Sequence, residues 1–125
     1  MTVIDQPAVD LSCFAVDHVD ARAKFLRAAE QAGALLADYR NPNQGPGGEV
    51  LYLDTAWLGS KDARKVLAIV SGTHGVEAFC GSGCQVDWLS NLGAPPADVA
   101  LLFVHALNPF GFAWLRRQTE ERTVE

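Results

Sequence analysis

The sequence predicts an α/β fold in a single domain, and three observations favour it. An apolar stripe with helical spacing follows Asp17, and two short apolar strands, residues 66–70 and 99–106, flank a second helical segment. A strand, a helix and another strand in this order form a crossover whose strands run parallel. The length of 125 residues suits one domain, because compact domains usually contain roughly 50 to 250 residues.

The composition excludes several classes of protein. Apolar residues make up 49% of the chain and charged residues 20%, which is typical of a globular protein and not of a disordered one. Ten Lys and Arg against 15 Asp and Glu give a net charge of -5, so we expect no nucleic-acid partner. The N-terminus lacks the pattern of a signal peptide, and no apolar run approaches the roughly 18 residues of a membrane span. We therefore expect a cytoplasmic protein with no membrane partner.

The first predicted element is a helix that begins after Asp17, a suitable N-cap residue. Apolar residues then recur at steps of three and four from Phe25 to Leu36, which predicts that the helix extends through Leu36. Residues 41–48 contain three Gly, two Pro and two Asn, so we expect a loop there.

Two strands are predicted next, over residues 50–58 and 65–70, with a turn at residues 59–62. Their closeness in the chain favours a β-hairpin. The second strand is a continuous apolar run without polar alternation, which is typical of a strand that is covered on both faces. We therefore expect it at the centre of the sheet.

A second helix is predicted from about Val76 to Asn91. Gly81 and Gly83 lie inside it, where they either weaken the helix or permit a close approach to the sheet. Cys80 and Cys84 are one helical turn apart and could share a metal ion, but free cysteines are most often buried as small apolar side chains. Burial is the prediction that we favour for both.

His74 and Glu77 are the first candidate site residues, because they follow a strand at the point where open α/β sheets bind ligands. At a spacing of three residues the two side chains project from the same side of a helix start. An imidazole and a carboxylate are two of the three protein ligands in a common hydrolytic zinc site. The alternative is a polar surface pair.

A second polar segment follows the neighbouring strand at the same edge of the predicted sheet. Asn108–Gly111 has the composition of an ordinary β-turn. Arg116 and Arg117 could polarise a carbonyl group, and surface charges are the alternative. His105 could either contact a metal ion held by His74 or be a hydrogen-bonded histidine of the core, which is the reading that we favour.

The segments 71–77 and 106–117 together resemble an uncharacterised bacterial branch of the zinc carboxypeptidase superfamily, a domain of unknown function. The wider superfamily includes succinylglutamate desuccinylase and aspartoacylase. The resemblance implies a three-layer α/β/α fold with a mostly parallel mixed sheet and a zinc cofactor. It also implies hydrolysis of an amide or peptide bond by zinc-activated water, in a peptide or an acyl-amino acid.

The same resemblance implies roles for individual residues. His74 and Glu77 correspond to zinc ligands, and Asn108 and Gly111 lie in the family's substrate-binding loop. Arg117 corresponds to the arginine that polarises the scissile carbonyl, with Arg116 as the alternative.

The sequence departs from that family after the arginine. Family members continue with an Asn-Arg segment, a second zinc histidine and a catalytic glutamate, and this sequence has no counterpart of them. We therefore expect residues 1–125 to form one partial domain, the N-terminal part of a catalytic domain truncated after its second parallel strand. Zinc would be held weakly, with little or no activity, and uncovered sheet surface would favour self-association. The alternatives are a noncatalytic binding or regulatory module and an acyl-amino-acid deacylase.

Overall fold

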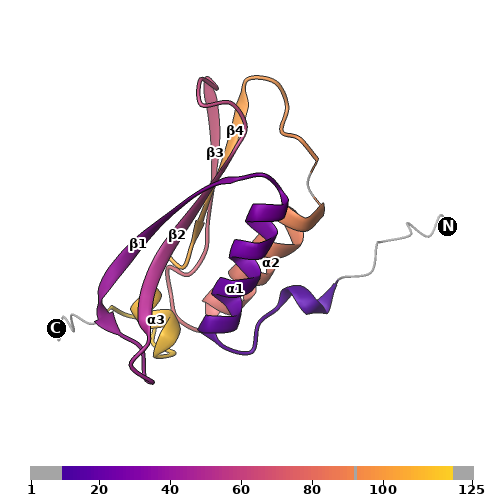
Figure 1. The fold of residues 1–125 in the computed structure, drawn as a ribbon. Coiled ribbons are helices and arrows are strands. Elements are labelled where there is room, and N and C mark those ends of the chain that lie inside the picture. The colour runs from indigo at the N-terminus through magenta and orange to yellow at the C-terminus, as the bar shows by residue number, and fades with distance from the viewer. Residues whose placement is uncertain (1–9, 92, 120–125) are drawn as a thin grey trace.

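The structure, a computed structural model, describes residues 10–91 and 93–119 (Figure 1). In chain order the elements are a 3₁₀ turn η1 (Leu11–Cys13), α1 (His18–Gln31), β1 (Leu35–Gln44), β2 (Val50–Leu58), β3 (Lys65–Val70), α2 (Glu77–Asn91), β4 (Val99–His105) and α3 (Pro109–Ala113). The strands form one mixed sheet in the order β1-β2-β4-β3. The α/β class is therefore confirmed.

The sheet is mostly antiparallel, which corrects the expectation of a mostly parallel one. β1 pairs with β2 and β2 pairs with β4 in antiparallel fashion. Only β3 and β4 are parallel within the described residues, as the strand–helix–strand order predicted.

Helices α1 and α2 lie side by side over one face of the sheet (Figure 1). The register places Ala56 of β2 opposite Phe103 of β4, and both side chains are fully buried on this face. Phe25 of α1 and Leu89 of α2 close the core from the other side. In the part of the chain that the structure describes, no helix is long and apolar enough to cross a membrane.

The start of α1 follows the prediction and its end does not. The Asp17 side chain accepts a hydrogen bond of 2.7 Å from the backbone N–H of Asp20, as expected of an N-cap. The helix ends at Gln31, and Gly33 takes a left-handed conformation with φ +78°. The predicted extension through Leu36 was wrong, because apolar residues after this turn continue into β1.

The loop predicted for residues 41–48 is shorter than expected. β1 continues to Gln44, which pairs with Val50 after an irregular stretch that contains Pro42. An edge strand tolerates proline, because its outer backbone groups need no strand partner. The tight turn is confined to the residues between the two strands, where the Gly45 N–H donates to the Glu49 carbonyl at 2.9 Å.

β3 is an edge strand, so two predictions about it were wrong. β4 lies between β2 and β3, and the expected hairpin does not form. The strand is also not covered on both faces, since Val66, Leu67 and Val70 are each about half exposed. Val66 and Val70 point to the face opposite α1 and α2, where no helix of the described residues covers the edge of the sheet.

α2 matches the predicted second helix, and its glycines allow close packing. A Cβ at Gly81 would lie 2.9 Å from Ser71 Cβ at the end of β3, and one at Gly83 would overlap the Phe14 ring. Cys80 and Cys84 are exposed on this helix, so the prediction that both are buried was wrong.

Candidate functional site

The segment that contains His74 joins β3 to α2 at the carboxyl end of the parallel strands. Two backbone hydrogen bonds attach it to the chain after β4: Leu107 N to Ser71 O at 2.9 Å and Asn108 N to Gly72 O at 2.8 Å. Gly72 has φ +74°, and a Cβ there would lie 2.8 Å from Ala106 Cα. The two polar segments therefore lie side by side, as the sheet argument predicted.

The ring of His74 contacts the second segment directly. Its Nδ1 lies 3.1 Å from the backbone carbonyl oxygen of Arg117, 43 residues further along the chain. A carbonyl oxygen only accepts hydrogen bonds, so Nδ1 is the donor and the lone pair of the neutral ring is on Nε2. A histidine that binds a metal through one nitrogen commonly donates from the other to such an oxygen.

Glu77 is the first residue of α2 and is exposed. In the described residues no group of three or more His, Cys, Asp and Glu side chains is placed to share one metal ion. His105 is therefore not brought into a common set with His74 and Glu77.

The segment Asn108–Gly111 forms the start of a short helix where a β-turn was predicted. Asn108 is its N-cap, and the side-chain oxygen accepts a hydrogen bond of 2.9 Å from Gly111 N. A Cβ at Gly111 would lie 2.7 Å from the carbonyl oxygen of Arg116. Asn108 and Gly111 thus determine the conformation of the loop that leads to the two arginines.

Arg116 and Arg117 are exposed at the end of this loop. Leu115 turns the chain with φ +54°, and the Arg116 N–H then donates to Gly111 O at 2.8 Å. The Arg116 guanidinium lies 5.9 Å from the centroid of the Trp114 ring, within the range of a cation–π contact. The structure therefore brings His74 and the arginine-bearing loop together.

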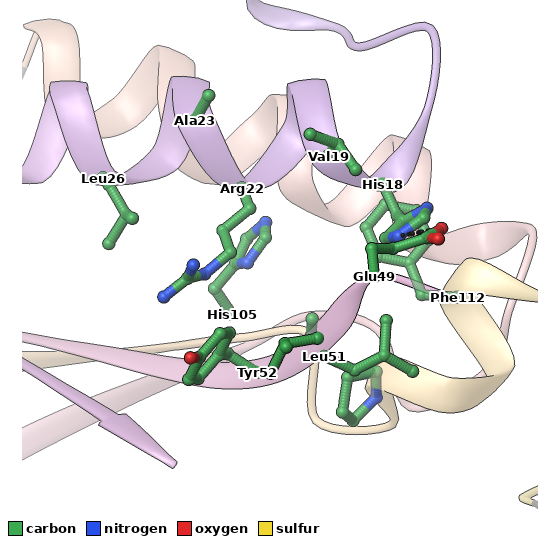
Figure 2. A pocket seen from close by; sticks show the side chains of 13 residues that line it. His18, Val19, Arg22, Ala23, Leu26, Glu49, Leu51, Tyr52, His105 and Phe112 are labelled. Carbon is green, nitrogen blue, oxygen red and sulfur yellow. Dashed lines mark ion pairs between the residues drawn. The ribbon is translucent and has the colours of Figure 1, made fainter. Parts of the chain in front are cut away.

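A second candidate site lies beneath α1 and contains two histidines, an arginine and a glutamate that the sequence analysis did not combine (Figure 2). The cavity has a volume of about 320 Å³ and apolar walls. His105 of β4 lines it with only 1% of its surface exposed, and its ring stacks on Phe25 at 4.4 Å. The favoured prediction of a hydrogen-bonded core histidine is confirmed, because His105 Nε2 lies 2.8 Å from the Ser82 hydroxyl.

Burial determines the charge of His105. Desolvation, with a smaller contribution from the Arg22 charge, lowers the pKa of its imidazole to about 4. The ring is therefore neutral at pH 7.

A partly buried ion pair lies beside this histidine. The Asp54 carboxylate is fully buried and accepts hydrogen bonds from Arg22 Nε at 2.8 Å and Nη2 at 2.9 Å. The guanidinium also lies 4.0 Å from the centroid of the Tyr52 ring. Asp54 was the available sequence signal, because it is the charged residue of the strand-forming run of residues 50–58.

The fold and its polar edge thus define a small α/β domain with the His-x-x-Glu segment at the carboxyl ends of its parallel strands. A family model described as "Protein of unknown function (DUF2817)" matches residues 14–124, so the chain belongs to that family. Comparison with curated proteins gives no match.

Two solved structures resemble this chain. The glutaminyl cyclase of Fimbriiglobus ruber has a TM-score of 0.50 and 12% identity over 76% of this chain and 42% of its own. The glutaminyl cyclase of Porphyromonas gingivalis has a TM-score of 0.49 and 10% identity over 83% of this chain and 51% of its own. The chain therefore spans about half the length of these proteins, or less. At such low identity the first likeness shows a shared fold.

Proposed function

We propose that this chain contributes part of a zinc-dependent hydrolase site of the metallocarboxypeptidase type, with His74 and Glu77 as the metal ligands. The observation that supports it most is the 3.1 Å contact between His74 Nδ1 and the Arg117 carbonyl. This contact leaves Nε2 free to bind a metal ion, and it joins the two segments that the reaction would need.

The residues at this edge would have different roles in the reaction. His74 Nε2 and the Glu77 carboxylate would hold the metal, and Asn108 and Gly111 would fix the shape of the substrate loop. A zinc ion at such a site lowers the pKa of a bound water and polarises a carbonyl group. Arg117, or Arg116 beside it, would stabilise negative charge that develops on the carbonyl oxygen of an amide or peptide bond.

Two protein ligands hold a metal weakly, because catalytic zinc sites use three. The described residues supply no third His, Cys, Asp or Glu side chain that could share a metal ion with these two. We therefore expect little or no turnover of a peptide or an acyl-amino acid by this chain alone. A deacylase would use the same groups and differ in its substrate.

Zinc titration by calorimetry tests the metal site. The background should be Cys80→Ser/Cys84→Ser, since the exposed thiols one helical turn apart could bind zinc themselves. In that background we expect weak binding that His74→Ala abolishes and Glu77→Gln reduces at least tenfold. Glu30→Gln, on the exposed surface of α1, is the matched control. Equal affinity in the His74 variant and its parent would overturn the proposal.

A second candidate function is a noncatalytic binding module that retains the scaffold. The cavity beneath α1 supports it, because this cavity is separate from the proposed metal site. Its lining contains neither His74 and Glu77 nor the two arginines. Ligand binding there that is unaffected by His74→Ala, together with no zinc binding, would favour this candidate.

A further inference from the structure

We propose that Cys80 and Cys84 of α2 form a two-coordinate binding site for a soft monovalent cation of the Cu(I) type. This site is independent of His74 and Glu77, because it uses other side chains and another metal chemistry. Three observations support it: both thiols are exposed, they lie one helical turn apart, and the charge around them is negative.

Both thiols lie on the same side of α2. Each cysteine is free and exposed. The helix runs without interruption from Glu77 to Asn91, so a spacing of four residues places Cys84 directly beyond Cys80 along one face. The two sulfur atoms can therefore meet at one ion that arrives from solvent.

The same spacing opposes a disulfide between the two cysteines. Side chains four residues apart on a helix have Cβ atoms about 5–6 Å apart, whereas a disulfide needs a separation of about 3.5–4.5 Å. The bond would thus require α2 to distort. A metal ion spans a longer distance, because it places two metal–sulfur bonds between the sulfurs, each about 2.3 Å long in zinc thiolates. The helix therefore favours metal binding over oxidation of the pair.

The charge around the two thiols favours a cation. Desolvation raises the pKa of the Cys84 thiol, and the neighbouring Cys80 thiol and the Asp87 carboxylate raise it further. Two thiolates side by side repel each other, and a cation between them removes this repulsion. Binding of Cu(I) releases the two thiol protons to solvent and forms two copper–sulfur bonds, with no change in the oxidation state of copper or sulfur.

The number of ligands determines which metal fits. In residues 10–91 and 93–119 no group of three or more His, Cys, Asp and Glu side chains is placed to share one ion. Zinc sites use three or four protein ligands, so a pair of thiols would hold Zn²⁺ weakly. Thiolates select Cu(I), a soft ion that two of them satisfy in a linear arrangement. The pair therefore favours Cu(I) over Zn²⁺.

Anaerobic titration with Cu(I), with bathocuproine disulfonate as the competing chelator, tests the site. We expect one Cu(I) per chain, and X-ray absorption should show two sulfur neighbours around the copper. An equal concentration of Zn²⁺ should not displace it. Cys80→Ser and Cys84→Ser should each lower the Cu(I) affinity at least a hundredfold.

Two variants separate the spacing of the thiols from their number. Cys13→Ser removes the buried third cysteine and should leave the Cu(I) affinity unchanged. In that background, Cys84→Ser/Ser90→Cys keeps two thiols at exposed positions of α2. It moves them ten residues apart, about 15 Å along the helix axis. This respaced variant should bind Cu(I) no better than Cys84→Ser.

Three results would overturn the proposal. The first is a respaced variant that binds Cu(I) as tightly as its parent, and the second is wild-type affinity in either single serine variant. The third is native mass spectrometry that shows one Cu(I) shared between two chains. Cys80 and Cys84 are exposed, so their serine variants keep the proposal testable if Cys13→Ser does not fold.

Discussion

His105 shows how one residue can be predicted correctly and still be incompletely understood. The sequence favoured a hydrogen-bonded core histidine, and the structure has it buried against Ser82 and Phe25. The cavity that it lines depends on α1 and β2, which are distant in the chain. No local pattern contains that information.

The lowered pKa of His105 predicts a pH dependence of stability. Its imidazole has a pKa of about 4 in the fold, against 6.5 as the usual value, so the unfolded chain binds more protons between these values. The free energy of unfolding should therefore rise by about 3 kcal/mol from pH 4 to pH 6.5 through this group. The stabilisation is fully present above pH 6.5 and is lost as the pH falls toward 4.

Urea unfolding from pH 4 to 7 measures this effect. The double variant His105→Phe/Ser82→Ala should lack the His105 contribution, so the difference between the two curves isolates it from the carboxylates. Parallel curves would mean that His105 titrates normally in the fold.

Gly72 lies in the segment that contains His74, so its conformation affects the candidate site. Its positive φ and the 2.8 Å approach to Ala106 predict that Gly72→Ala destabilises the fold by about 2 kcal/mol. Gly93→Ala is the matched control, because a Cβ there meets nothing within 4 Å. Urea unfolding measures the free energy of unfolding of both variants. A Gly72 variant as stable as the Gly93 variant would contradict this prediction.

At the scale of elements, local signals predicted the helices and strands better than their pairing. The Asp17 cap and the strand-forming run of residues 50–58 are local, and the corresponding elements are present. The end of α1 was misplaced because Leu35 and Leu36 fit the apolar stripe of a helix and also a strand. Partner choice depends on long-range packing, so the hairpin prediction failed when β4 paired between β2 and β3.

The part of the candidate site that depends on the order of the strands could be predicted from the sequence. Parallel strands end at one edge, so the approach of the His74 segment to residues 108–117 followed from the order of elements. The hydrogen bond that orients His74 could not be predicted from the sequence, because its acceptor is a backbone carbonyl, a group that every residue has.

At the scale of the whole molecule, one face of the sheet is apolar and incompletely covered. The register aligns Leu35, Trp57, Leu102 and Ala68 across the sheet on the side opposite α1 and α2. Several large apolar side chains on this side are about half exposed: Leu35, Tyr39, Val66 and Val70. Exposed apolar side chains on the two edge strands of this face favour association.

We expect this face to bind a second copy of the chain. Sedimentation should show self-association that increases with protein concentration and that Val66→Lys/Val70→Lys weakens at least tenfold. Leu11→Lys replaces an apolar residue outside the sheet that is even more exposed than the two valines, and it should have no effect. A monomer at every concentration would contradict this expectation, as would equal effects of the two changes.

We propose that His74 and Glu77 hold a metal ion and that His74 binds it through Nε2. Nitrogen-15 NMR of the imidazole rings in the Cys80→Ser/Cys84→Ser protein tests it most directly. Before zinc is added, His74 should show a protonated Nδ1 and an unprotonated Nε2. Zinc should then shift the Nε2 signal of His74 and leave that of His105 unchanged. A protonated Nε2 in the neutral ring, or a His74 signal indifferent to zinc, would contradict the claim.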